Sequence, residues 1–254
     1  MSKTFNLDAD ISSRFRAEGN AAYKTACEET EPFHTRKALQ KALTLYVKAY
    51  EAAGDDDERA SAAKNCAVAA SRLANIDAAL GDRPATLVAL YDADAVTYYS
   101  CAMHDGRRHK AHEWRNTVSV SYAKCVRSAI DHIADAASQM THRNRTAALW
   151  KLIGCMVEPS RKADVFVEVA RVEFDAGVVS LARKDYRAAL YAFSECSEPS
   201  GNALMHAPNN EEVRCQMSFL NEDINFHQAT AESLQAISTG RARLPFIFLK
   251  KFNC

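Results

Sequence analysis

The stretch from Arg16 to Tyr50 constrains the fold most, because it contains two runs of small and apolar residues at helical spacing. We expect Gly19 to let a neighbouring backbone approach closely, since glycine inside a helix costs about 1 kcal/mol relative to alanine. Two amphipathic helices cannot bury both stripes alone, so further helices are expected to pack on them. The first stripe consists of Phe15, Gly19, Ala22 and Ala26, and the second of Leu39, Ala42, Leu43, Tyr46, Ala49, Tyr50 and Ala53.

Composition favours helix throughout the chain. Only 8 glycines and 6 prolines occur in 254 residues, so few tight turns are available. The alternation of β-branched residues that announces strands is missing. With 32 basic and 32 acidic residues the formal net charge is zero, which removes any global electrostatic argument for nucleic acid or an anionic membrane as a partner. We therefore predict an all-α protein.

Cysteine usage and the absence of long apolar runs predict the compartment. Eight cysteines are scattered along the chain without a Cys-x-x-Cys motif, which is typical of a reduced intracellular protein. The first ten residues lack an apolar core of signal-peptide length, and no run approaches the roughly 18 apolar residues of a membrane span. The sequence therefore predicts a cytoplasmic protein.

Breaks in the apolar pattern divide the chain into a series of helices. Gly81 to Pro84 is the strongest break, and the acidic run after Gly54 suits the start of the next helix. The last predicted helix reads as a cap on the exposed end of a stack, and a basic, aromatic tail follows at 241–254. The helices are predicted at about 8–29, 39–53, 58–80, 85–104, 111–139, 146–157, 161–184, 185–196 and 209–238.

These residues resemble the tetratricopeptide repeats. That repeat places an aromatic residue, a glycine and a tyrosine in its first helix and Ala-x-x-x-Phe in its second. The first match covers about residues 12–54, where the wording G-N-A-A-Y-K is especially similar to co-chaperone-type members. The second covers about 165–200, where Gly177 is twelve residues before Ala189, the family spacing, and Phe193 follows. The matching residues of the first repeat are Phe15, Gly19, Tyr23, Ala42, Tyr46 and Ala49.

One departure from the family lies between the two helices of the first repeat. Gly19 and Ala42 are twenty-three residues apart, eleven more than the family spacing. The surplus falls on the segment CEETEPFHTRK, which contains Pro32. It predicts either an enlarged turn or extra helical turns.

The resemblance implies a fold and a general function. It implies one domain over 1–254, built as an antiparallel helix-pair array that winds into a right-handed α–α superhelix with long helices and a C-terminal capping helix. The first helix of each repeat lines a concave surface, which in the family usually binds peptides or other proteins. We therefore expect a non-enzymatic adaptor.

The resemblance also implies candidate binding residues. Co-chaperone members hold the terminal carboxylates of chaperone tails with a basic residue and an asparagine four apart in the first helix, a second asparagine from the next repeat and basic residues from the third. Charge-assisted donors on rigid helices suit a carboxylate. The alternative is that these side chains are simply solvated. Arg16 and Asn20 match the first pair, Lys24 continues their helix face, Asn65 matches the second asparagine, and Arg115 or Lys124 could supply the third element.

A second constellation has soft ligands at short spacing, Cys101, His104, His109 and His112. It could in principle hold zinc, but the spacing matches no finger, and three neighbouring basic residues disfavour a cation. We therefore predict no metal and no cofactor. The neighbouring basic residues Arg107, Arg108 and Lys110 could contact an anionic partner.

Catalysis has little support, and one further function stays open. The chain has no Gly-rich phosphate loop, no His-Glu-x-x-His and no nucleophile elbow, so no enzyme is expected. The alternative function is a structural assembly module, a homodimer for example, in which the last helix and the apolar tail Leu244 to Phe252 pair with a second copy or a larger complex.

Overall fold

The computed structural model describes residues 7–156 and 159–239, and every regular element in those ranges is helical. This confirms the all-α prediction. Packing divides the chain into two compact units, Met1–Arg161 and Lys162–Cys254, and each is described by itself below. A single domain over 1–254 stays a prediction. No helix within the described residues is long and apolar enough to cross a membrane.

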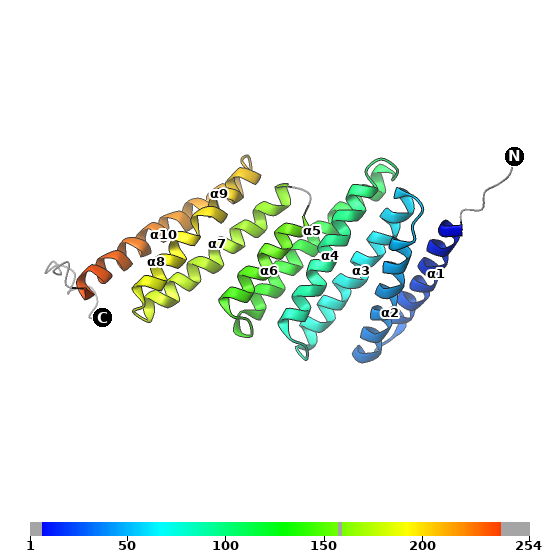
Figure 1. The fold of residues 1–254 in the computed structure, drawn as a ribbon, viewed down its shortest axis with the longest axis horizontal. Helices are drawn as coiled ribbons and strands as arrows, with labels where there is room; N and C mark the ends of the chain where they lie inside the picture. Colours follow the sequence, from blue (N-terminus) through cyan, green and yellow to red (C-terminus); the bar gives the residue numbers. More distant parts are fainter. Residues whose placement is uncertain (1–6, 157–158, 240–254) are drawn as a thin grey trace. The chain divides into compact units, whose positions relative to one another are not determined.

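The first unit is a succession of helices in which neighbours along the chain pack on one another (Figure 1). The helix α3 is its centre, since α2 and α4 pack closely against it and both α1 and α5 also touch it. The elements are α1 (Leu7–Glu28), α2 (Pro32–Glu51), α3 (Asp56–Leu80), α4 (Ala85–Asp105), α5 (His112–Asp135), the 3-10 helix η1 (Ala136–Ser138) and α6 (His142–Cys155).

The helices α1 and α2 form an antiparallel pair. Ser12, near the start of α1, donates its hydroxyl to the Ala49 carbonyl near the end of α2 at 2.9 Å. Ala26, near the end of α1, shares a core cluster with Leu39 near the start of α2. Only residues 29–31 join the two helices. The surplus of eleven residues is therefore helical, and Pro32 is tolerated because it lies in the first turn of α2.

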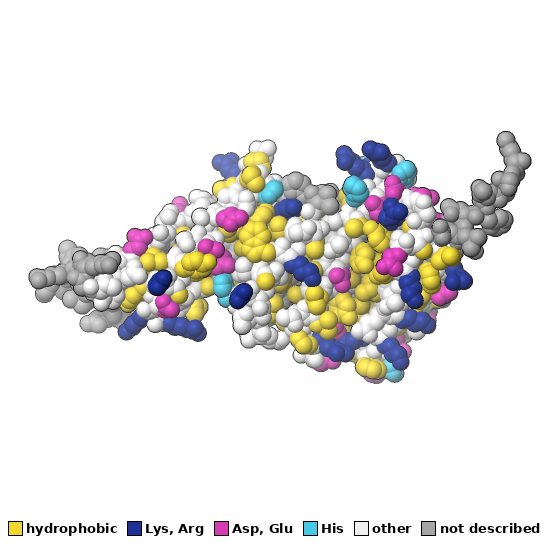
Figure 2. All heavy atoms as spheres, in the orientation of Figure 1, with side chains coloured by type: hydrophobic (Ala, Val, Ile, Leu, Met, Phe, Trp, Pro, Cys, Tyr) yellow, Lys and Arg dark blue, Asp and Glu magenta, His cyan; other side chains and the backbone are white. Residues whose placement is uncertain are grey.

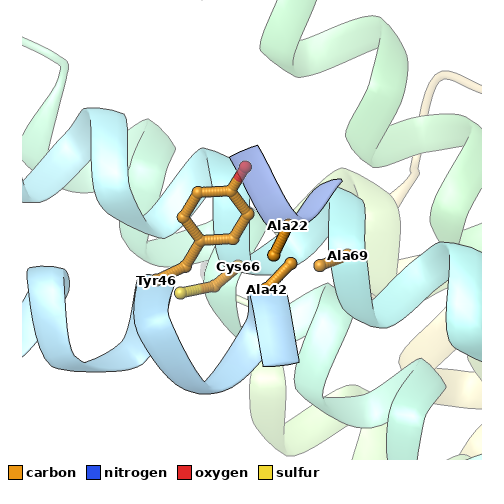
Figure 3. Packing of buried hydrophobic residues seen from close by; sticks show 5 residues of the cluster. All are labelled: Ala22, Ala42, Tyr46, Cys66 and Ala69. Atoms are coloured by element: carbon orange, nitrogen blue, oxygen red, sulfur yellow. The ribbon is translucent and has the colours of Figure 1, made fainter. Parts of the chain in front are cut away.

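Gly19 admits an aromatic ring. A Cβ added to Gly19 would lie 2.7 Å from two ring carbons of Tyr46, so only glycine fits beneath that ring as it stands. Tyr46 is buried and packs with Ala22, Ala42 and neighbouring residues of α3 (Figure 3). The expectation that a neighbouring backbone approaches Gly19 was wrong: the element that approaches is a side chain from α2.

The predicted breaks around α3 are confirmed by its caps. The Asp55 carboxylate accepts a hydrogen bond from the Glu58 amide at 2.8 Å, and three acidic residues follow in the first turn. At the other end Gly81 takes a left-handed conformation with φ of 64°. Between the caps, small buried side chains let neighbouring helices come close: Ala60, Ala62, Ala63, Cys66, Ala67, Ala69, Ala70 and Ala74.

Two buried polar ties join helices of the first unit. Arg36 of α2 donates to Asp77 of α3 at 2.6 Å and to Asp82, just beyond α3, at 2.7 Å. His132 of α5 and Asp92 of α4 are 2.9 Å apart. Each tie satisfies a charge that burial would otherwise penalise.

The second unit repeats the glycine and aromatic contact. A Cβ on Gly177 of α7 would clash with the ring of Phe193 on α8, as at Gly19 and Tyr46. No helix is predicted from the sequence between 196 and 209, but the structure has one there, which contains Pro199. Proline is harmless there, since it lies in the first turn of α9. The helices are α7 (Pro159–Ala182), α8 (Tyr186–Glu195), α9 (Ser197–His206) and α10 (Glu211–Ser238).

Candidate functional site

Two of the predicted binding residues, Asn20 of α1 and Asn65 of α3, lie side by side. The Asn20 Oδ1 atom accepts the Tyr46 hydroxyl at 2.9 Å, and the Asn65 Nδ2 atom lies 3.5 Å from the same oxygen. Because the carbonyl end of the Asn20 amide meets two donors from the protein, its NH₂ end is the one left for a ligand. The pair therefore presents hydrogen-bond donors.

Arg16 lies one turn before Asn20 on α1 and is half-buried. Its neighbours Arg14 and Lys24 pair with Glu18 at 3.9 Å and Glu28 at 3.7 Å. No described residue pairs with Arg16. Arg16 therefore keeps an uncompensated charge beside the two amides, whereas the charge of Lys24 is matched locally.

Sequence reasoning missed Arg72, two turns after Asn65 on α3. Its guanidinium lies 5.4 Å from the centre of the Tyr23 ring and donates to the Ala26 carbonyl at 3.4 Å. The spacing of seven from Asn65 was the available signal, because it places both residues on one helix face. We call Arg16, Asn20, Asn65 and Arg72 together the α1–α3 polar face.

Long stretches of α3 and α5 contain no acidic residue. No acidic residue occurs in 59–76 of α3 or in 114–130 of α5. The two helices are linked near their C-terminal halves, where Ser128 donates to Asn75 at 3.1 Å. An anionic ligand on these stretches would therefore meet donors and cations without a facing carboxylate.

Arg115 and Lys124 lie elsewhere on α5. Among the described residues, no hydrogen bond or ion pair joins either of them to Arg16, Asn20 or Asn65. Lys124 lines a shallow depression along α5. Arg115 lines a separate cavity between α4 and α5.

That cavity has a volume of about 450 Å³, and none of the described residues lining it is acidic. Its floor is polar, since the Ser100 hydroxyl donates to the buried Tyr122 oxygen at 3.2 Å. The Arg115 Nη1 atom donates to the Arg107 carbonyl at 3.3 Å, while its Nε atom is buried without a hydrogen-bond partner among the described residues. The lining consists of Ser100, Met103, His104, Arg107, His112, Arg115, Asn116, Ser119 and Tyr122.

The four residues weighed as zinc ligands are divided by this arrangement. His104 and His112 line the cavity, whereas His109 faces Asp56 at 3.8 Å. In the described ranges no three histidine, cysteine or acidic side chains converge as a metal site would require.

Burial raises the pKa of the Cys101 thiol. It also raises the pKa of Cys125 and Cys196 to about 12, so these thiols are protonated at neutral pH and poorly nucleophilic.

Of the three comparisons with known proteins, only the one with solved structures found similar chains. No family model and no curated protein matches the chain. A chain described as "Computational Design of Self-Assembling Cyclic Protein Homooligomers" is 15% identical, with 93% of this chain and 98% of that chain covered and a TM-score of 0.36. The DHF58 filament is 12% identical, with 90% and 97% covered and a TM-score of 0.30. Function is therefore inferred from the side chains themselves.

Proposed function

We propose that the protein is a non-enzymatic adaptor that binds a peptide or protein segment on the α1–α3 polar face. The observation that carries this proposal is the convergence of Asn20 and Asn65, forty-five residues apart, into one group of outward donors. Arg16, which pairs with no described residue, lies one helical turn from Asn20. A terminal carboxylate, such as that of an acidic chaperone tail, matches these donors in charge and geometry. A cytoplasmic location belongs to the same proposal.

We also propose that the fold is a tetratricopeptide-like superhelix. Two features support it: the antiparallel pairing of α1 and α2, and the glycine under an aromatic ring in both resembling repeats. In such an array α1, α3 and α5 are the first helices of successive repeats and line the concave surface. Contacts of α3 with both α1 and α5 agree with that role.

Peptide titration tests the adaptor proposal. An acidic C-terminal chaperone peptide, followed by fluorescence anisotropy, should bind with micromolar affinity, and the Arg16→Ala, Asn20→Ala double variant should lose at least about tenfold, or 1.4 kcal/mol. The matched control is Lys24→Ala, which removes a charge already paired with Glu28 and should change affinity less than about twofold. Equal binding of the same peptide with an amidated C-terminus, or no binding by the folded protein, would overturn it.

A second candidate function, self-association through α10, is favoured by two exposed aromatic side chains. Phe219 and Phe226 are 65% and 68% exposed and lie seven residues apart on one face of the helix. The tail at Leu244 to Phe252 that the same hypothesis invokes lies outside the described residues. Light scattering should show a dimer mass that a Phe219→Ser, Phe226→Ser variant loses. Met205→Ser, an equally exposed change on α9, should keep it.

A further inference from the structure

We propose that the cavity between α4 and α5 binds a phosphate monoester. The cavity is distinct from the α1–α3 polar face, so this inference does not rest on the peptide-binding proposal. Two guanidinium and two imidazole groups line it, from Arg107, Arg115, His104 and His112. With no carboxylate among its described lining residues, the cavity is suited to an anion of more than one charge.

The strongest single pointer is the Arg115 side chain, which lines the cavity and is fixed by the protein around it. Its Nε atom is buried and has no hydrogen-bond partner among the described residues. One of its terminal nitrogens is already fixed by the Arg107 carbonyl, so the fork is held in place. Guanidinium geometry fits two oxygens of a phosphate, so the fixed side chain is suited to bind an oxyanion that enters the cavity.

The wall that carries these cations is held by contacts outside the cavity. Lys110, in the turn between α4 and α5, pairs with Asp57 of α3 at 2.7 Å and lies 5.5 Å from the Trp114 ring centre. Gly106 lies directly under the Trp114 ring, where a Cβ would come within 2.7 Å. Figure 2 shows basic and histidine side chains gathered over the end of the unit where α4 and α5 are joined, with acidic ones beside them. Such a wall needs little ordering when an anion enters.

The first turn of α5 adds to the same field. Ala111 caps the helix without any side-chain hydrogen bond, so free backbone N–H groups remain at this end. His112 and Arg115 belong to this turn and also line the cavity. The positive end of the helix dipole therefore acts with the side chains rather than against them.

The size of the cavity explains why a monoester is proposed. A volume of about 450 Å³ falls within the range of small-ligand sites, roughly 300–1,000 Å³, and far exceeds one phosphate group. Met103 and Tyr122 offer apolar surface for whatever carries the phosphate, and Asn116 and Ser119 offer polar contacts. The carrier is either a phosphorylated side chain of another protein or a small phosphorylated molecule.

Calorimetric titration of the full-length protein tests the proposal with four probes: a phosphoserine peptide, free phosphoserine, inorganic phosphate and glutamate. We expect both phosphoserine probes to bind more tightly than inorganic phosphate, and glutamate to bind at least tenfold more weakly. A peptide much tighter than free phosphoserine identifies a partner protein as the source, and equal affinities identify a small molecule. Equal binding of glutamate and phosphoserine, or no binding of any phosphate probe, would overturn the proposal.

Variants locate the binding. Arg115→Gln should weaken phosphoserine at least tenfold, and Arg107→Gln, an exposed position whose change leaves the core intact, should weaken it at least threefold. Arg127→Gln is the matched control, because that arginine is exposed and pairs with Asp131 at 3.2 Å outside the cavity. Its affinity should stay within twofold, and so should that of the Arg16→Ala, Asn20→Ala variant. Unchanged affinity in both Arg115→Gln and Arg107→Gln would refute the site.

Discussion

Gly19 and Gly177 each lie beneath an aromatic ring, at Tyr46 and Phe193. Alanine at either position adds a methyl group where the ring already lies, so the pair must separate or the ring must leave its rotamer. We expect Gly19→Ala and Gly177→Ala each to lower the free energy of unfolding by about 1–3 kcal/mol, measured by urea denaturation.

Gly201 supplies the control for this prediction. It lies in α9 with no atom within 4 Å of an added Cβ. Alanine there should therefore be neutral or stabilise by up to about 1 kcal/mol through helix propensity alone. Stabilisation by Gly19→Ala of the same size as by Gly201→Ala would contradict the proposed ring contact.

The pair of His132 and Asp92 makes stability depend on pH. The hydrogen bond with Asp92 raises the pKa of His132, so the folded protein holds that proton more tightly than the unfolded chain. Burial raises the pKa of Asp92 above its ordinary value of 3.8, so the ionised form of this carboxyl costs stability. The stability from His132 is complete below its unfolded pKa near 6.5 and is lost as pH rises through its folded pKa.

Denaturation at pH 6 and pH 8.5 measures this dependence. The free energy of unfolding should fall more between these values in the natural protein than in a His132→Gln variant, which lacks the titrating ring. An equal fall in both proteins would mean that the pair contributes nothing to the slope.

Sequence periodicity places residues on helix faces but does not say which faces meet. The stripes through Gly19 and Tyr46 were therefore readable, and so was the helix face of Arg16 and Asn20. The position of Asn65 beside Asn20 came from the family resemblance. Arg72 was not found, and Arg115 was predicted as part of a peptide clamp rather than as a residue that lines a cavity. Their roles depend on contacts across 45 or more residues or on a cavity between two helices.

At the scale of elements, Arg36 ties the start of α2 to the end of α3 through Asp77 and Asp82. Asp77 is 1% exposed, so Asp77→Asn breaks a buried charge pair and should cost about 3 kcal/mol of unfolding free energy. Asp82 has a side chain that is 52% exposed, and the Arg36 hydrogen bond lowers its pKa. Asp82→Asn should cost clearly less free energy of unfolding, with both variants measured by urea denaturation. Equal losses in the two variants would show that burial does not set the strength of these ion pairs.

Helix boundaries were predictable where the sequence has a capping residue or a glycine at the end of a helix. Asp55 and Gly81 bound α3 through side-chain capping and a left-handed turn, both readable from residue type. The surplus around Pro32 could not be assigned, because proline suits a first helical turn as well as a loop. The helix α9 was not predicted. Its Pro199 lies in the first turn, where proline is again compatible with either a helix or a loop.

At the scale of the whole molecule, the two units differ in their spectroscopic reporters. The chain has two tryptophans, Trp114 and Trp150, and both belong to the first unit. Tryptophan fluorescence therefore reports on Met1–Arg161 alone, whereas circular dichroism reports on the helices of both units. We expect the two urea transitions not to coincide.

A variant in each unit makes this expectation specific. Gly177→Ala should shift the circular dichroism transition and leave the fluorescence transition in place, while Gly19→Ala should shift the fluorescence transition. Coincident transitions that move together in both variants would show that the chain unfolds as one cooperative body.

The helical class was predictable because composition and period act locally. The division into Met1–Arg161 and Lys162–Cys254 was not, since it depends on how densely distant helices pack rather than on any break in the pattern. The handedness of the helix array also depends on contacts between distant helices, so it remains part of the proposal of a tetratricopeptide-like superhelix.

The alanine-rich packing of α3 also affects how fast its amide protons exchange with solvent. Its backbone is covered by neighbouring helices, and most of its buried side chains are alanines, which cannot move aside to admit water. An amide there meets solvent only when several helices separate together. The amide protons of α3 should accordingly be the last in the first unit to be replaced by deuterium, long after those of α1.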